Sequence, residues 1–131
     1  MSSTTEKRVH INDLHNDHKL WLNKLAFCKE EIGILEHRME DIAKRNTGKE
    51  VMAELEQFQN QFIRQREVID ELMHSSKLHE SELAKESIDQ PVAIDRKLYA
   101  DHTAHREEMD TFDKLYYELK NEFMQWLVKR M

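Results

Sequence analysis

Apolar residues recur at alternating intervals of three and four residues along three long segments of the chain. This is the spacing of the a and d positions of a heptad repeat, which together form one face of an α-helix. The pattern continues in phase over residues 11–42, 51–83 and 98–126. It predicts three long helices that pack against one another through these faces, as helices do in a coiled coil.

Two short segments interrupt the pattern. Asn46, Thr47 and Gly48 form the first, where Asn or Gly favours a helix end and Thr47 favours a helix start. Pro91 marks the second, because proline is tolerated only in the opening turn of a helix. A break at Gly33 would instead produce four shorter helices, but the heptad pattern runs through that position in phase, which favours an unbroken helix.

The composition supports a single all-α domain over residues 1–131. The chain has only two Gly and one Pro, which is typical of long helices rather than of a sheet. We expect helices over about residues 9–45, 48–86 and 90–130, with residues 1–8 as a frayed tail. Because both connections are short, neighbouring helices are expected to run in opposite directions, giving an antiparallel up-down-up three-helix bundle with coiled-coil-like packing.

Charge and motifs narrow the classes of function. The formal net charge of −6 comes from acidic and basic residues mixed along the whole chain, so no nucleic-acid partner is expected. No apolar run approaches the roughly 20 residues of a membrane helix, and the polar start is unlike a secretory signal. The single cysteine, Cys28, falls at a core position and excludes an intrachain disulfide, which favours the reducing cytoplasm. Without a phosphate-binding loop, a zinc-finger spacing or a nucleophile elbow, no catalytic residue is assigned.

Large apolar residues also recur outside the a and d positions of the first helix. Leu20, Phe27 and Ile34 are spaced seven residues apart at the c position, about 130° from the packing face. Isolated surface apolar residues are common, but three aligned ones can merge into an interface, and two-fold dimers are the commonest oligomers. A homodimer or a heterologous protein partner is therefore expected at this row. A weaker row on the last helix is a candidate extension of the interface: Tyr117, Met124, Val128 and Met131.

Histidines take a and d positions near one end of the expected bundle: His18, His79, His102 and His105. Antiparallel pairing brings them together from three helices, and converging imidazoles supply the ligands that Zn or Fe prefers. Four nearby polar residues are predicted to support these ligands: His15, Ser76, Asp101 and Glu108. The alternative is a polar core layer in which the imidazoles bond to one another, to Ser76 and to water, with no metal bound.

These observations lead to two hypotheses about function. The first is a small cytoplasmic bundle that oligomerises and serves as an interaction or structural module, without a catalytic signature or a cofactor. The second is a metal-binding or metal-sensing protein that uses the histidine end of the bundle. The apolar row of the first helix and the lack of catalytic motifs favour the first hypothesis.

Overall fold

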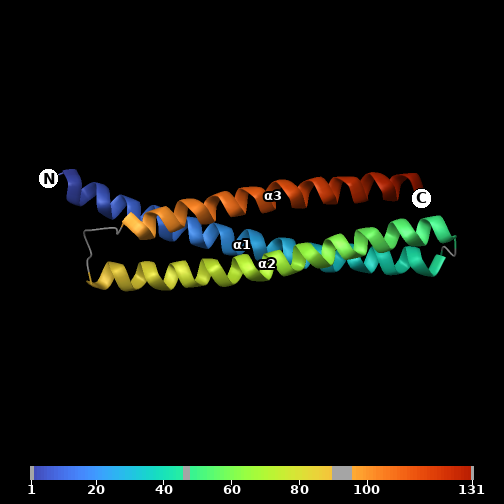
Figure 1. The fold of residues 1–131 in the computed structure, drawn as a ribbon, viewed down its shortest axis with the longest axis horizontal. Coiled ribbons are helices and arrows are strands. Elements are labelled where there is room, and N and C mark those ends of the chain that lie inside the picture. Colours follow the sequence, from blue (N-terminus) through green and yellow to red (C-terminus); the bar gives the residue numbers. More distant parts are fainter. Residues whose placement is uncertain (1, 46–47, 90–95, 131) are drawn as a thin grey trace.

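The computed structural model describes residues 2–45, 48–89 and 96–130, with side chains over 11–45, 48–85 and 97–130. Apart from Gly48, these residues form three helices: α1 (Ser2–Arg45), α2 (Lys49–Asp89) and α3 (Arg96–Arg130). No strand occurs in the described ranges, so the predicted all-α class with three helices is confirmed. Figure 1 shows the helices as long rods that lie along one common direction. None of the helices in these ranges is both long enough and apolar enough to cross a membrane.

The bounds of the helices differ from the expected ones in two places. α1 begins at Ser2, so residues 2–8 are helical where the sequence pattern predicts a frayed tail. That segment contains no Gly or Pro, and extending an existing helix needs only one further backbone hydrogen bond per residue. α3 begins at Arg96 rather than at about residue 90. Pro91 and the expected turn residues Asn46 and Thr47 lie outside the described residues.

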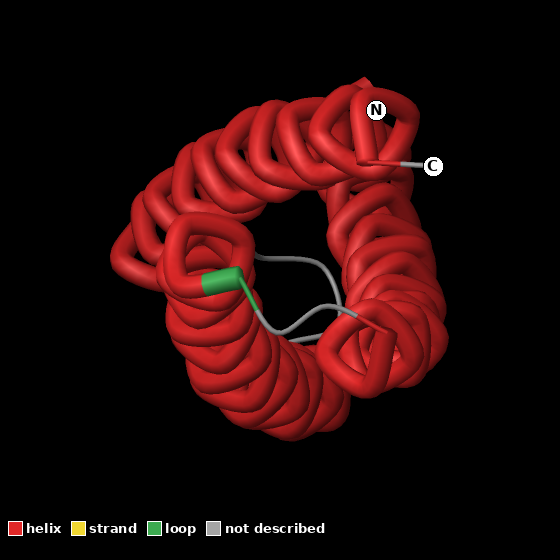
Figure 2. Tube along the Cα trace, turned by 90° about the vertical axis from the view of Figure 1, so that its right-hand side faces the viewer, coloured by secondary structure: helices red, strands yellow, loops and turns green. Residues whose placement is uncertain are grey.

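Contacts between side chains show how the helices are aligned. Along α1 and α2 the numbers of the contacting residues change in opposite senses: His18 with Glu80, Lys29 with Asp70, and Glu36 with Arg66. Along α1 and α3 the numbers rise together: Asp17 with Arg106, Lys24 with Asp113, and Glu31 with Lys120. Thus α2 runs back along α1, and α3 runs in the same direction as α1. Figure 2, which looks along the rods, shows the three helices arranged around a common centre.

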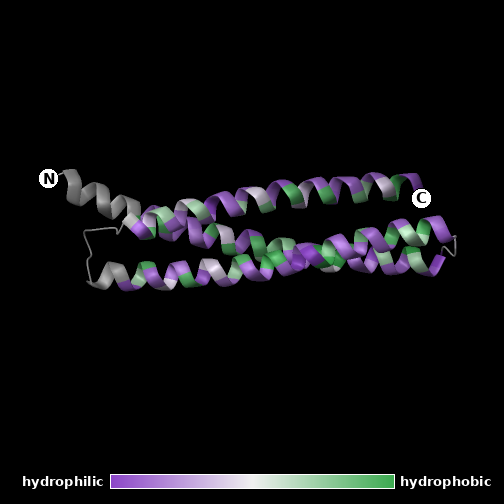
Figure 3. Cartoon of the chain, viewed as in Figure 1, coloured by the Kyte–Doolittle hydropathy of each residue, from purple (hydrophilic) through white to green (hydrophobic). Residues whose placement is uncertain are grey.

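The apolar core is divided into two unequal parts. The larger part lies along α1 from Leu25 to Met39 and includes most of the buried aromatic side chains of α2 and α3. The smaller part consists of Leu14, Leu83 and Leu98. Figure 3 shows hydrophobic residues recurring at intervals along each helix, as the heptad pattern predicts. Fully burying one Leu or Phe side chain stabilises a protein by about 1.5–3 kcal/mol, so the larger part supplies most of the hydrophobic stabilisation.

Cys28 lies within the larger part of the core, at the core position expected from the sequence. Its side chain is buried, and burial raises the pKa of the thiol to about 11. The thiolate is the reactive form of cysteine, so this side chain is an inert apolar group at neutral pH.

Candidate functional site

A layer of four histidines separates the two parts of the core. His18 lies on α1 and His79 on α2, while His102 and His105 lie one turn apart on the same face of α3. On every helix these positions fall between a residue of the smaller core part and a residue of the larger one. Three of the side chains are buried, and that of His79 is half-buried. The four predicted ligands, called the histidine layer below, are thus neighbours in the structure.

Glu80 on α2 binds two histidines of α1. Its Oε1 accepts a hydrogen bond from Nδ1 of His18 at 2.8 Å, and its Oε2 accepts one from Nδ1 of His15 at 2.5 Å. The side chain of His18 is only 2 % exposed, whereas that of His15 is 43 % exposed. Because an ionised carboxylate only accepts hydrogen bonds, His18 carries a proton on Nδ1, and the atom that offers a lone pair in the metal-binding form of the ring is Nε2.

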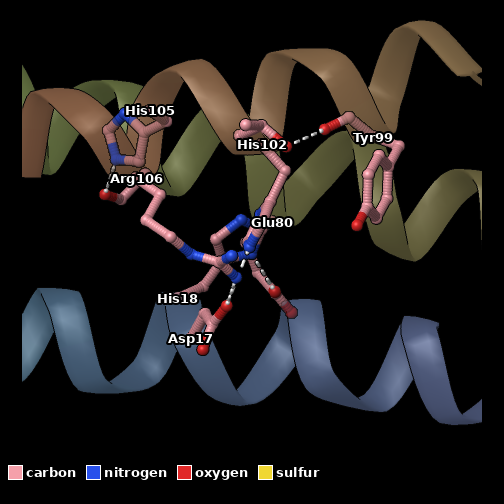
Figure 4. A network of polar contacts seen from close by, with 9 residues as sticks. Asp17, His18, Glu80, Tyr99, His102, His105 and Arg106 are labelled. Atoms are coloured by element: carbon pink, nitrogen blue, oxygen red, sulfur yellow. Dashed lines mark hydrogen bonds and ion pairs between the residues drawn. The ribbon is translucent and has the colours of Figure 1, made fainter.

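Asp17 and Ser76 hold the two histidines of α3. His102 Nε2 donates to Asp17 Oδ2 at 2.9 Å, and His105 Nε2 lies 2.6 Å from Ser76 Oγ. Arg106 also donates to Asp17, at 2.6 Å, and Figure 4 shows both α3 side chains reaching toward this carboxylate. Burial alone would raise the pKa of Asp17, but its hydrogen bonds with His102 and Arg106 outweigh burial and lower that pKa. The neutral His102 ring therefore has its lone pair on Nδ1.

The other ring nitrogen of each of these three imidazoles is buried and has no hydrogen-bond partner among the described residues. The atoms are His18 Nε2, His102 Nδ1 and His105 Nδ1, and His79 Nδ1 shares this property. Buried polar atoms are paired in the great majority of cases, because leaving one unpaired costs about 1–3 kcal/mol. Four unpaired imidazole nitrogens in one layer are therefore the feature of this fold that most requires a chemical explanation.

The rings of the layer lie close together. The centroids are 5.0 Å apart for His18 and His102, 4.9 Å for His79 and His105, and 6.2 Å for His18 and His79. Trp21 covers the side of the layer that faces the larger core, with its ring 4.8 Å from that of His102 and 5.1 Å from that of His105. In the ranges that the structure describes, no group of three or more His, Cys, Asp or Glu side chains is arranged so that it could hold a metal ion.

Burial sets the charge of the α3 histidines. Burial, the larger cause, and the positive charge on the other imidazoles of the layer together lower the pKa of His105 to about 4. Burial also lowers the pKa of His102, although the hydrogen bond to Asp17 acts in the opposite direction. Both imidazoles are therefore neutral at pH 7, and neutral imidazole is the form that binds metal ions.

Two of the four predicted supporting residues belong to this network. Ser76 contacts His105 directly, and His15 shares Glu80 with His18. Asp101 and Glu108 make no hydrogen bond with the layer in the part of the chain that the structure describes. Both occupy g positions of α3. Arg106 occupies an e position, on the opposite side of the packing face.

The carboxylates that do contact the imidazoles, Asp17 and Glu80, were not predicted. Each adjoins a histidine of the layer in the sequence, and their g and e positions flank the packing faces of α1 and α2. A search for acidic residues at g and e positions next to the core histidines would have found them. It would also have found Asp101, so the pattern alone does not select the correct carboxylates.

The predicted apolar row is exposed on α1. Leu20, Phe27 and Ile34 are 65 %, 57 % and 65 % exposed. Their c positions are next to the g positions, where Lys24 and Glu31 form ion pairs with α3. The row therefore lies along the side of α1 that borders α3.

α3 adds exposed apolar side chains to the same side of the molecule. Tyr117 and Met124 are 42 % and 44 % exposed, at b positions next to the e positions through which α3 contacts α1. Lys24 Nζ lies 5.9 Å from the centre of the Tyr117 ring, which places this ring at the border of the two helices. Of the rest of the weaker row, Val128 is exposed and Met131 lies outside the described residues. The apolar face, as used below, consists of Leu20, Phe27, Ile34, Tyr117 and Met124.

Comparisons with models of protein families, with curated proteins and with solved structures found no match to this chain.

Proposed function

We propose that the protein is a homodimeric interaction module in which two antiparallel up-down-up three-helix bundles meet through the apolar face. The observation that carries the proposal is the row of Leu20, Phe27 and Ile34, each more than half exposed and all at the same heptad position of α1. Aligned apolar side chains on a surface mark interaction sites far more often than scattered ones do.

The packing of the helices supports this location. The backbones of α1 and α3 approach each other less closely than either approaches α2. The side chains between them are the ion pairs Lys24–Asp113 and Glu31–Lys120, which occupy the border below the apolar face. A helix that packs over this border buries apolar side chains from α1 and α3 together.

A second copy of the chain is a fitting partner because the row is self-complementary. In an antiparallel pairing of two α1 helices with the two-fold axis at Phe27, Leu20 of one copy lies opposite Ile34 of the other. The same axis brings Lys24 of one copy opposite Glu30 of the other, so opposite charges meet beside the apolar contacts. Such an isologous interface uses one surface patch twice and closes as a dimer.

The size of the face sets the expected strength of the dimer. Complete burial of a Leu, Ile or Phe side chain is worth about 1.5–3 kcal/mol, and these side chains are already partly covered. The two chains also lose translational and rotational freedom when they associate, and this loss opposes binding. A weak dimer therefore follows, with a dissociation constant between about 1 µM and about 1 mM.

Light scattering over a range of protein concentration up to about 1 mM, the upper end of this range, tests the proposal. The molar mass of the parent chain is expected to rise from that of a monomer toward that of a dimer. Replacing Leu20, Phe27 and Ile34 together by Ser should keep the chain monomeric throughout. The matched control is Leu78→Ser, which changes an exposed Leu at the c position of α2 and should leave dimerisation unaltered. A parent chain that stays monomeric, or a control that loses the dimer equally, contradicts the proposal.

A further inference from the structure

The proposed dimer makes no use of the histidine layer, whose unpaired ring nitrogens stand out among the buried atoms. We propose that this layer is a Zn²⁺ site in which His18, His102 and His105 bind one ion and His79 is the fourth ligand. All four imidazoles belong to one chain, so the site is independent of dimerisation.

The hydrogen bonds around the layer are those of metal-binding histidines. A histidine that ligates a metal almost always donates its other ring N–H to a carboxylate, a backbone carbonyl or a water molecule, which fixes the tautomer and the orientation of the ring. His18 has this arrangement with Glu80, and His102 has it with Asp17. In both rings the nitrogen that carries the lone pair is the buried, unpaired one. His105 repeats the arrangement, with Ser76 Oγ as the outer partner.

Two of the ring separations match those expected for imidazoles bound to a tetrahedral ion. With Zn–N bonds of about 2.0–2.1 Å and tetrahedral angles, the centroids of two ligating imidazoles lie about 5 Å apart. The observed separations are 5.0 Å between His18 and His102 and 4.9 Å between His79 and His105. The separation of 6.2 Å between His18 and His79 involves the half-buried ring, which has the most room to move. We therefore expect rotation of the side chains, rather than movement of the helices, to bring the ring nitrogens around the ion.

The chemistry of the ligands selects the ion. Imidazole nitrogens suit Zn²⁺ and its transition-metal neighbours, whereas Ca²⁺ and Mg²⁺ require oxygen ligands. The carboxylates of Asp17 and Glu80 are engaged with the outer ring nitrogens, so nitrogen is the ligand atom that faces the interior of the layer. Four protein ligands make a closed site, which is the arrangement of structural and sensing zinc centres rather than of catalytic ones.

The test uses the full chain without a histidine tag, freed of metal with a chelator and then titrated with Zn²⁺ in a calorimeter. The parent is expected to bind one Zn²⁺ per chain and to melt at a higher temperature with the ion than without it. Co²⁺ in place of Zn²⁺ should give the intense visible absorption of a tetrahedral site. The double variant His18→Ala/His102→Ala should lose both the stoichiometric binding and the absorption.

The matched control removes the same number of imidazoles from the surface. His37 is 82 % exposed on α1 and His74 is exposed on α2, so His37→Ala/His74→Ala should bind Zn²⁺ as the parent does. If this control loses as much affinity as the core variant, the binding comes from scattered surface histidines and the proposal is wrong. A parent that binds no Zn²⁺ has a hydrogen-bonded polar layer instead, and this outcome also overturns the proposal.

If the double variant His18→Ala/His102→Ala loses its helicity, a milder variant tests the zinc site instead. Asp17→Asn keeps the shape of the side chain but removes the charge that orients His102. Loss of such an outer partner weakens metal binding by about 10-fold to 100-fold, and the stoichiometry of one ion per chain should be retained. Asp17→Glu should restore part of the affinity. Unchanged affinity in Asp17→Asn rules out His102 as a ligand.

Discussion

The same three helices build two regions that differ in what holds them together. In the larger core part, a and d positions carry aliphatic and aromatic side chains, and rings such as Phe62 and Phe123 pack edge to face with centroids 5.7 Å apart. In the histidine layer, the equivalent heptad positions carry imidazoles and Ser76. The heptad repeat is unbroken across both regions, so the geometry of the helices is the same and the chemistry alone changes.

The contacts in the two regions differ in how strongly their energy depends on direction. Apolar contacts in the larger core tolerate small shifts of one helix along another, because dispersion and burial have no preferred angle. Each hydrogen bond of the layer joins a different pair of helices: Glu80 to His18 for α2 and α1, Asp17 to His102 for α1 and α3, and Ser76 to His105 for α2 and α3. We therefore expect the apolar region to supply most of the stability and the layer to fix the register of the three helices.

The largest effect expected from this division is a loss of stability when the apolar region is truncated. Phe62 is fully buried beside Phe123, so Phe62→Ala should lower the free energy of unfolding by about 3–5 kcal/mol. Ile63, the next residue, is 45 % exposed, and Ile63→Ala is the matched control with an expected cost of about 0.5 kcal/mol. Urea unfolding followed by circular dichroism measures both. A cost below about 1 kcal/mol for Phe62→Ala would remove the distinction between the two regions.

Much of the division between the larger core part and the histidine layer can be predicted from the sequence, because the helical period of 3.6 residues determines which side chains share a face. The spacing places Leu25, Phe62 and Tyr116 in the core, and all are fully buried. It also places histidines at a and d positions near one end, which makes a mixed polar layer predictable from the heptad pattern alone. Faces within a helix need no knowledge of its neighbours, and for this reason they are the most predictable feature.

Partners across the helices are less predictable. The residue that faces His102 depends on the rotation of α3 about its axis and on its register against α1, and one residue of slip exchanges one carboxylate for another. Asp101 adjoins His102 in the sequence, yet Asp17 on α1 binds it. The start of α1 at Ser2 was not predicted, because residues 2–8 have no heptad pattern that would indicate a helix.

A smaller effect, confined to the layer, is expected from acid in chelator-treated protein. His105 has a folded-state pKa of about 4 and an unfolded value near 6.5, so the unfolded chain binds more protons between these limits. Stability that is fully present above about pH 6.5 is then lost as the pH falls toward 4, by up to about 3 kcal/mol. His105 faces Ser76 and other imidazoles, and among the described side chains no carboxylate is hydrogen-bonded to its ring to retain a proton there.

The two tryptophans report the two regions separately. Trp21 stacks on His102 in the layer, and Trp126 packs against Phe123 in the larger core. Trp126→Phe leaves Trp21 as the only tryptophan, and Trp21→Phe leaves Trp126 as the only tryptophan, so excitation that is selective for tryptophan reports one region at a time. Trp21 fluorescence should change as the pH falls from about 6.5 toward 4, the interval between the unfolded and folded pKa values of His105, whereas Trp126 fluorescence should stay constant over that interval. Identical acid transitions in the two variants contradict the division into regions.

The smallest expected effect has the opposite sign and lies on the surface of the apolar region. Gly33 is inside α1, and a Cβ placed there meets no atom within 4 Å. Gly33→Ala should therefore raise the free energy of unfolding by about 0.5–1 kcal/mol, because Ala loses less backbone entropy than Gly when the helix forms. Thermal unfolding of dilute, monomeric protein measures the gain, and the acid response of Trp21 should not change. Gly33 adjoins Ile34 of the apolar face, so a gain in dilute solution that disappears at dimer-forming concentrations means that a second copy packs closely against this backbone.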